Sequence, residues 1–252
     1  QILSIYSEYA GSASGLKLGD DSCKVIAFTS PCGGVGSSTM AAACALHYAA
    51  RGKRTLYLNF ERFGSSDAFF AAEGQFDMSG IIFALKSKKT NLSMKMESCV
   101  KQDPRGVYFY SQSKVALDML ELGADEIGRL ISEARLSGNY EYVIADLEFG
   151  MDRASLQILR QAGAIVWTGD GSEISNRKLA RAYQALAILE QNAEVPLTAR
   201  IALIYNKFSN KSGTAVTGTE LRSIGGAPRY EHASTAQVLE QLAPKELFDK
   251  IQ

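Results

Sequence analysis

The chain has 252 residues, 46% of them hydrophobic, which is enough to bury one sizeable core. Its 27 basic and 27 acidic residues balance, which argues against a broad electrostatic grip on nucleic acid or acidic lipid. Four cysteines without a C-x-x-C spacing, together with two histidines, argue against a zinc site or a disulfide scaffold. They predict buried or inert thiols in a reducing cytoplasm.

Residues 1–23 are rich in Gly and Ser and predict a linker, whereas a regular alternation of elements begins at Lys24. Short apolar runs predict buried strands at 24–29, 54–60, 106–110, 142–145, 164–167 and 200–205. The segments between them predict helices at 38–51, 77–86, 125–136, 153–161 and 173–191. This alternation indicates an α/β fold, a mainly parallel sheet with helices on both faces. Ligands bind such sheets beyond the carboxyl ends of the strands.

The stretch SPCGGVGSSTM, residues 30–40, joins the first predicted strand to the first predicted helix. Its glycines allow backbone N–H groups to converge on an anion, and the following helix adds its N-terminal amides. Ser38 stands where a hydroxyl can bind Mg²⁺. A tight turn with a serine cap stays open as the alternative on these residues alone. The predicted phosphate-binding residues are Gly33, Gly34, Val35, Gly36, Ser37, Ser38 and Thr39.

A dinucleotide-binding fold uses similar loop geometry, with the pattern G-x-G-x-x-G and an acidic residue after the second strand. Gly34 and Gly36 fit the start of that pattern, and Glu61 is roughly placed for the acid. Thr39 stands at the third glycine position, however, so the sequence disfavours this class of protein.

Two polar residues end later strands in the order that a nucleoside triphosphate site needs. Asp146 ends the strand in YEYVIADLE, where a carboxylate can hold Mg²⁺ through water. Asn206 ends the strand in LIYNK, and its amide carries the donor and the acceptor that can recognise the edge of an adenine. Each residue is common at a strand end, so their order rather than either residue indicates the site.

With these residues in place, the chain from Lys24 onward resembles the MinD/ParA group of P-loop ATPases, whose loop reads K-G-G-x-G-K-[ST]-T. Residues 32–39 read CGGVGSST. The resemblance implies that residues 24–252 form a domain that binds ATP and Mg²⁺. Ser38 and Asp146 then match the metal ligands. Glu61 and Asp146 match the acids at the catalytic centre, with Asn59 at the first acid of the D-x-D pattern. Asn206 matches the residue that recognises adenine, and Pro228, in GGAPRY, matches a loop that packs on the base.

The chain departs from the family at both loop lysines, which are replaced by Cys32 and Ser37. In the family the first lysine reaches the partner's phosphates across a dimer, and the second lies along the β- and γ-phosphates. Lysine charge stabilises the transition state of phosphoryl transfer, so its loss lowers hydrolysis more than binding. The sequence therefore predicts a loop that holds ATP better than it cleaves it, with a slow but active ATPase switch as the alternative. Lys207, Arg229 or Arg62 is the expected partial substitute for the lost charge.

Eroded loop lysines make the chain most similar to the TadZ/CpaE-like proteins of Flp-type (tight adherence) pilus systems. That resemblance implies a cytoplasmic homodimer that helps to place pilus-assembly proteins at a cell pole. It also implies a receiver-like domain before the linker, which the start at Gln1 fits.

Two other roles within the group are disfavoured. A ParA-type DNA-partition ATPase needs a basic surface, which the balanced charge does not supply. A MinD-type tail that inserts directly into a membrane needs an unbroken basic amphipathic helix. The tail from Gln237 on is interrupted by Pro244 and carries acidic residues, so we expect a helix that packs on its own domain.

Overall fold

The structure, a computed structural model, describes residues 23–87, 91–115, 117–191 and 196–251. The predicted linker therefore lies outside the described residues except for Cys23.

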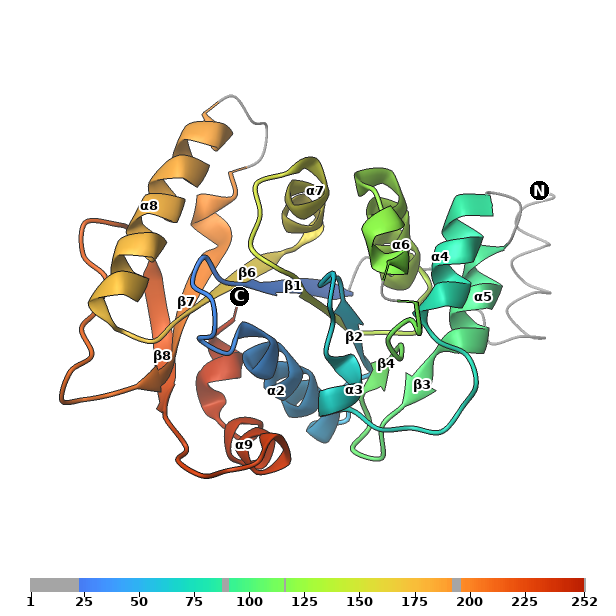
Figure 1. The fold of residues 1–252 in the computed structure, drawn as a ribbon, viewed down its shortest axis with the longest axis horizontal. Helices are drawn as coiled ribbons and strands as arrows, with labels where there is room; N and C mark the ends of the chain where they lie inside the picture. The colour runs from blue at the N-terminus through green and yellow to red at the C-terminus, as the bar shows by residue number, and fades with distance from the viewer. Residues whose placement is uncertain (1–22, 88–90, 116, 192–195, 252) are drawn as a thin grey trace, which may run out of the picture.

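Eight strands form one sheet in the order β3-β4-β2-β5-β1-β6-β7-β8 (Figure 1). Strand β3 runs antiparallel to β4, and every other neighbouring pair in this sheet is parallel. The strands are β1 (Lys24–Thr29), β2 (Thr55–Asn59), β3 (Lys101–Gln102), β4 (Tyr108–Phe109), β5 (Tyr142–Asp146), β6 (Ala164–Gly169), β7 (Ile201–Phe208) and β8 (Arg222–Pro228). The expected mainly parallel sheet is confirmed.

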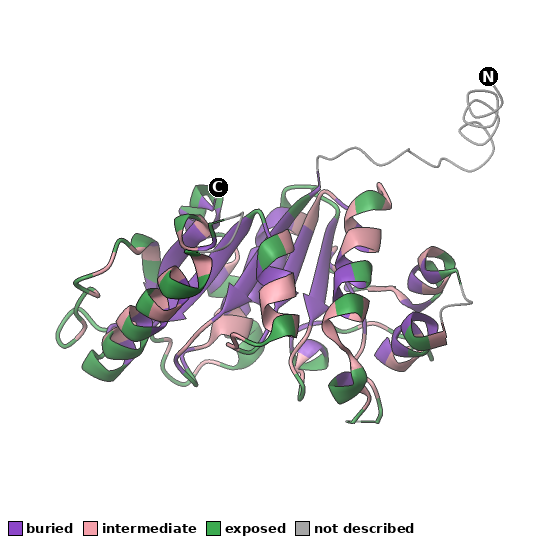
Figure 2. Cartoon of the chain, turned by 90° about the horizontal axis from the view of Figure 1, so that it is seen from above, coloured by how far each residue is buried: buried purple, intermediate pink, exposed green. Residues whose placement is uncertain are grey.

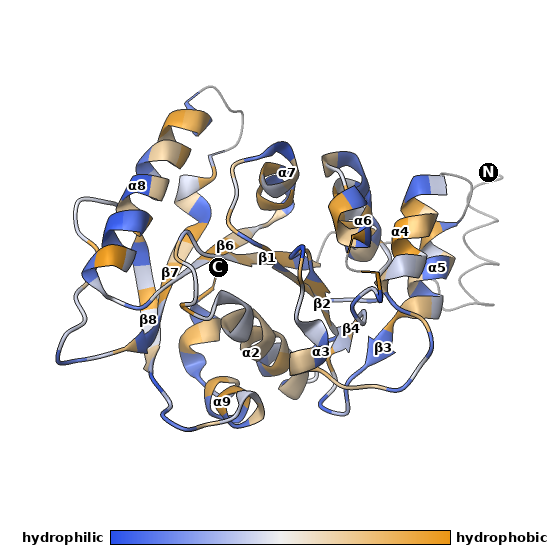
Figure 3. Cartoon of the chain, viewed as in Figure 1, coloured by the Kyte–Doolittle hydropathy of each residue, from blue (hydrophilic) through white to orange (hydrophobic). Residues whose placement is uncertain are grey.

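The central strands are buried on both faces, which explains why they are continuous apolar runs rather than alternating ones (Figures 2 and 3). One face carries α4 (Met78–Ser87), α5 (Leu92–Cys99), α6 (Ala124–Leu136), α7 (Arg153–Gln161) and α8 (Glu173–Glu190). The opposite face carries α2 (Ser37–Ala50), α3 (Ser66–Phe69) and α9 (Thr235–Leu242), together with the 3₁₀ turn η3 (Glu246–Lys250). Helices therefore cover both faces, as predicted.

The sequence patterns missed α3, α5, β3 and β8. Strand β8 reads RSIGGAP, with glycines and little apolar character, because it lies at an edge of the sheet where only part of it is buried. Its pairing also extends β7 to Phe208, since Phe208 pairs with Pro228. Two expected positions are thus corrected: Asn206 lies inside β7 rather than at its end, and Pro228 ends a strand rather than lying in a loop.

The C-terminal segment packs against α2, as expected for a tail that belongs to its own domain. Leu242 and Phe248 are fully buried in the core on that face. The Tyr48 hydroxyl donates to the Phe248 carbonyl at 3.0 Å, and a ring nitrogen of buried His47 lies 2.8 Å from an Asp249 carboxylate oxygen. Among the described helices, none has both the length and the apolar character needed to cross a membrane.

Candidate functional site

The glycine loop connects the carboxyl end of β1 to the first turn of α2, at the edge of the sheet where a ligand is expected. Gly34 and Gly36 have φ values of 74° and 86°, a left-handed conformation that glycine adopts without strain. Helix α2 begins at Ser37 with Gly36 at its N-cap, and no side-chain hydrogen bond caps it. No acidic residue lies in its first turn either. Its N-terminal amides and dipole are therefore available to an anion, and the alternative of a serine-capped turn is not what forms.

Cys32, at the position where the resemblance to the MinD/ParA loop predicts the first lysine, faces inward. Its side chain is 6% exposed, and its thiol donates to the Ser175 carbonyl at 3.4 Å. The Ser175 hydroxyl donates in turn to the Cys32 sulfur at 3.3 Å. Residue 32 is thus packed beneath the N-terminal turn of α8 and does not extend from the loop. All four cysteines are buried and unpaired, as the sequence predicts.

Ser37, where the same resemblance predicts the second lysine, carries a buried hydroxyl oxygen that has no hydrogen-bond partner among the described residues. Ser38, the next residue, donates from its hydroxyl to Glu61 Oε1 at 3.1 Å. The two predicted residues Ser38 and Glu61 therefore lie together, one at the start of α2 and one just after β2.

Asp146 completes this group from the end of β5. Its side chain is fully buried, and its Oδ2 accepts hydrogen bonds from the Tyr57 hydroxyl at 2.6 Å and from Asn59 Nδ2 at 3.2 Å. Its Oδ1 is buried and has no hydrogen-bond partner among the described residues. Burial, and then repulsion from Glu61, raise the pKa of Asp146 to about 7.

Tyr57 is the residue of this group that sequence reasoning missed. It lies two positions before Asn59 in β2, so the two side chains face the same side of the sheet. Asn59 pairs with Asp146 across the β2–β5 ladder, which brings Tyr57 within reach of the same carboxylate. Burial raises the pKa of Tyr57, so its hydroxyl stays protonated and donates. Strand alternation counted back from Asn59 could have identified it.

The oxygen atoms at this point suit a hard divalent cation. Ser38, Glu61 and the unpartnered Oδ1 of Asp146 are the oxygen donors that Mg²⁺ prefers. In the described ranges, no cluster of three or more His, Cys, Asp or Glu side chains could hold a metal by itself. The donor set therefore fits a Mg²⁺ ion that takes its remaining ligands from water and phosphate.

The remaining predicted residues meet on the other side of the loop. Asn206 Nδ2 donates to the Val35 carbonyl at 2.8 Å, and Lys207 Nζ donates to the Gly34 carbonyl at 2.8 Å. These two residues line a cavity of about 150 Å³ together with Thr39, Pro228, Arg229 and Tyr230. One space beside the glycine loop is therefore surrounded by residues from α2, from β7 and from the end of β8.

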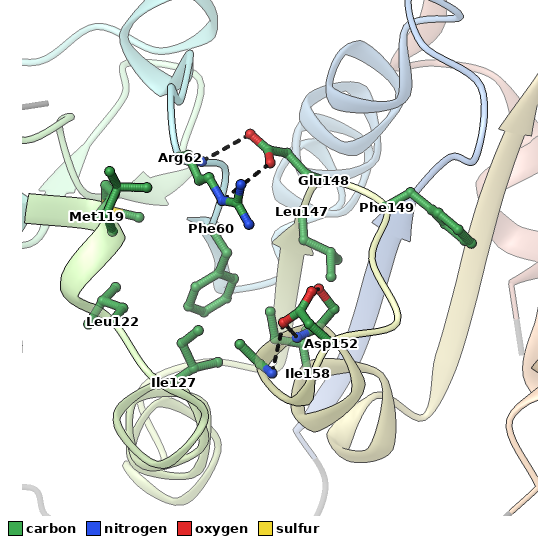
Figure 4. Close-up of a pocket in the computed structure, with 13 residues that line it drawn as sticks. Phe60, Arg62, Met119, Leu122, Ile127, Leu147, Glu148, Phe149, Asp152 and Ile158 are labelled. Atoms are coloured by element: carbon green, nitrogen blue, oxygen red, sulfur yellow. Dashed lines mark hydrogen bonds and ion pairs between the residues drawn. The ribbon is translucent and has the colours of Figure 1, made fainter. Parts of the chain in front are cut away.

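A separate pocket of about 260 Å³ lies between the segments that follow β2 and β5 (Figure 4). Ile127, Leu147 and Ile158 are among the apolar side chains that line it. Arg62 and Glu148 link the two segments: the Arg62 N–H donates to Glu148 Oε1 at 3.2 Å, and Arg62 Nε lies 3.8 Å from Oε2. Arg62, one of the expected substitutes for the loop lysines, is thus paired with an acid in the next loop.

Comparisons by sequence found no match, either to a known protein-family profile or to a curated protein. Comparison of structures did. The chain is similar to a ParA-family ATPase from Chlorobium tepidum TLS, with 20% identity over 92% of this chain and 96% of that chain and a TM-score of 0.70.

Two further solved structures are similar over nearly their whole length. One is the MinC:MinD cell division complex of Aquifex aeolicus, with 17% identity, 90% and 93% coverage and a TM-score of 0.63. The other is a putative plasmid partition protein from Borrelia burgdorferi B31 bound to AMPPNP, with 15% identity, 90% and 98% coverage and a TM-score of 0.58. At these identities the likeness shows the fold, which agrees with the strand order and the glycine loop described above. The chain therefore has the fold of the ParA/MinD-type P-loop ATPases.

Proposed function

We propose that residues 24–252 bind ATP with Mg²⁺ and hydrolyse it slowly or not at all. The observation that carries this proposal is the juxtaposition of the uncapped N-terminus of α2 with Asp146, a buried carboxylate whose Oδ1 has no hydrogen-bond partner in the described part of the chain. The first binds an anion and the second binds a cation, and a nucleoside triphosphate with its metal presents both.

In this proposal, separate groups of residues bind the phosphates, the metal and the base. The backbone of residues 33–39 holds the phosphates, while Ser38, Asp146 and Glu61 hold the metal. Mg²⁺, when bound, neutralises phosphate charge. One of the two N–H groups of the Asn206 amide donates to the Val35 carbonyl, so the residue shapes the loop. Its second N–H and its oxygen remain for the base. Pro228 and Thr39 line the space for the base.

Weak hydrolysis follows from the charge of the loop. Cys32 is uncharged and packed against Ser175, and Ser37 is uncharged, so neither position gives the loop a cation. Cationic groups aimed at the transferring phosphoryl group stabilise its transition state, and their loss lowers the rate more than ground-state affinity. A slow ATPase switch with real turnover is the second candidate, favoured by the acids Glu61 and Asp146 at the metal position.

The cellular role that we propose is a TadZ/CpaE-like localisation factor of Flp-type pilus assembly, acting in the cytoplasm as a homodimer with pilus-assembly proteins. The replaced loop lysines support it. The MinD protein of similar fold was solved in complex with a second protein, MinC. The balance of basic and acidic residues favours this role over DNA partition, which needs a basic surface. A fluorescent fusion of the whole protein should form a polar focus in piliated cells, and a uniform distribution would contradict the localisation role.

Calorimetric titration of ATP with Mg²⁺ into the wild-type protein and into Ser38→Ala tests the nucleotide site. We expect wild-type binding and a loss of about tenfold in the variant, because the hydroxyl that contacts Glu61 and the metal is removed. Ser98→Ala, on α5, is the matched control and should bind as wild type. Absence of ATP binding to the wild-type protein would disprove the proposal.

A further inference from the structure

Lys207 lies in an unusual backbone conformation at the end of β7. Its φ is 57°, and among the described residues only His232 shares a positive φ without being glycine. The ladder with β8 shifts register here: three steps along β7, from Tyr205 to Phe208, match two steps along β8, from Gly226 to Pro228. The extra residue is a β-bulge, which redirects a side chain out of the regular alternation. Left-handed backbone is costly for lysine, so the surrounding structure enforces this direction.

The bulge directs Lys207 onto the glycine loop. Its Nζ donates to the Gly34 carbonyl at 2.8 Å, and its Cε would lie 3.8 Å from a Cβ added at Gly36. Asn206 donates to the Val35 carbonyl in the same way, so consecutive residues of β7 bind consecutive carbonyls of the loop. An ammonium has three N–H donors, and the Gly34 carbonyl uses one. The positive charge is therefore held at the loop with further donors for a ligand.

The other candidates for this charge are placed differently. Arg62 pairs with Glu148 across the pocket of Figure 4. Arg229 lines the cavity beside Thr39 but, in the part of the chain that the structure describes, makes no hydrogen bond to the loop backbone. Lys207 thus combines a charge, a hydrogen bond to the loop and an enforced backbone conformation.

We propose that Lys207 is the phosphate-binding cation of this site. It supplies from β7 the positive charge that positions 32 and 37 of the loop do not carry, and its ligand is the polyphosphate of the bound nucleotide. The inference rests on the proposed nucleotide binding and names the residue that compensates for the altered loop. Because the cation approaches from the side of β7, it stabilises bound phosphate without occupying the position of either loop lysine.

The test compares Lys207→Asn with Lys207→Arg, titrating each with ATP and with adenosine in the presence of Mg²⁺. Asparagine tolerates the left-handed conformation and removes the charge, whereas arginine keeps the charge. We expect Lys207→Asn to weaken ATP binding about tenfold to hundredfold. Adenosine binding should weaken much less, although Lys207 also lines the cavity assigned to the base. Lys207→Arg should retain most of the ATP affinity. Lys211→Asn removes a nearby exposed lysine and should bind both ligands as wild type.

Each outcome decides the inference. Unchanged ATP affinity in Lys207→Asn would overturn it and leave the nucleotide site intact. An equal loss of ATP and adenosine would also overturn it, since the lysine would then shape the loop rather than bind phosphate. A wild-type protein that binds neither ligand would contradict the proposed function itself, and this inference with it. The thermal unfolding midpoint of each variant separates a loss of fold from a loss of phosphate binding.

Discussion

The Asp146 carboxylate is fully buried, and its two oxygens differ in their hydrogen bonding. Tyr57 and Asn59 donate to Oδ2, while Oδ1 has no hydrogen-bond partner among the described residues. Burial and the nearby Glu61 raise the pKa of Asp146 to about 7, so the metal-free site retains a proton well above the pH at which an exposed aspartate loses it. A bound cation reverses this preference and favours the ionised form.

The raised pKa predicts that Asp146→Asn changes stability with pH. The folded-state pKa lies above the unfolded value, so the folded state binds more protons and loses stability as pH rises from about 4 to about 7. Asparagine does not titrate. We therefore expect the change in free energy of unfolding caused by Asp146→Asn to favour the folded state more at pH 8 than at pH 5, by roughly 2 kcal/mol. Urea unfolding without Mg²⁺ measures this change.

Asp125→Asn is the control for this prediction, because its carboxylate is exposed. It should show little change between the two pH values. The same change in free energy of unfolding for Asp146→Asn at pH 5 and pH 8 would contradict the buried, proton-binding state of Asp146.

Tyr57 fixes the orientation of Asp146. We therefore expect its hydroxyl to affect ATP binding only when Mg²⁺ is present. Tyr57→Phe removes the 2.6 Å hydrogen bond to Oδ2 and leaves Asn59 as the donor to that atom. We expect ATP binding in the presence of Mg²⁺ to weaken about tenfold, and binding in EDTA to be unchanged.

The matched control is Tyr183→Phe, a half-buried tyrosine on α8. It should bind ATP as wild type with and without Mg²⁺. An equal loss of affinity for Tyr57→Phe under both conditions would show that Tyr57 supports the fold of the site rather than its metal.

At the scale of elements, the glycine loop is anchored to α8 through position 32. A lysine there would place an ammonium beneath the N-terminal turn of α8, where the helix dipole is unfavourable to a cation. We expect Cys32→Lys to lower the free energy of unfolding by about 2–4 kcal/mol without restoring hydrolysis. Urea unfolding and phosphate release measure the two effects.

Cys32→Ala separates charge from lost packing and should cost less than the lysine variant, because it removes only the sulfur. If Cys32→Lys instead folded with wild-type stability and hydrolysed ATP, position 32 would not be committed to α8. The eroded loop would then differ from an active ATPase by one residue.

The elements that the sequence predicted are those with a local signal, either an apolar pattern that follows burial or a capping residue. Strand β6 is buried along its whole length and appears as an unbroken apolar run. Helix α7 begins at Arg153 and is capped by Asp152, whose carboxylate accepts from the Ala154 and Ser155 amides, and its bounds match the predicted ones. Strand β8 and helix α5 carry weaker signals. Strand β8 is a glycine-containing edge strand, and α5 is short, with polar residues at half of its eight positions, although Asn91 caps it.

The candidate site divides in the same way. The glycine loop and Asp146 are local signals, a turn and a strand end, and the sequence shows them directly. The inward direction of Cys32 depends on Ser175, which lies 143 residues away. The reach of Lys207 to Gly34 depends on a bulge that forms only when β8 pairs with β7. Contacts of this kind arise from tertiary packing and leave no periodic trace in the chain.

At the scale of the whole molecule, the fold matches that of an ATPase more closely than the charge of the glycine loop does. The sheet order and the helices on both of its faces agree with a ParA/MinD-type ATPase fold. The loop carries no charge at positions 32 and 37, where the resemblance predicts lysines and this chain has Cys32 and Ser37. A fold of this kind can keep the backbone that binds phosphate while losing the cations that promote its transfer.

The most direct measurement of this account is a single-turnover experiment, with wild-type protein in excess over ATP and with Mg²⁺ present. Bound ATP and released phosphate are followed in the same sample. The account predicts that ATP binds and stays intact through many dissociation half-lives, so that phosphate release remains at background. Prompt release of phosphate at about 1 s⁻¹ or faster, the range of ordinary enzymes, would contradict it and make the protein a working ATPase.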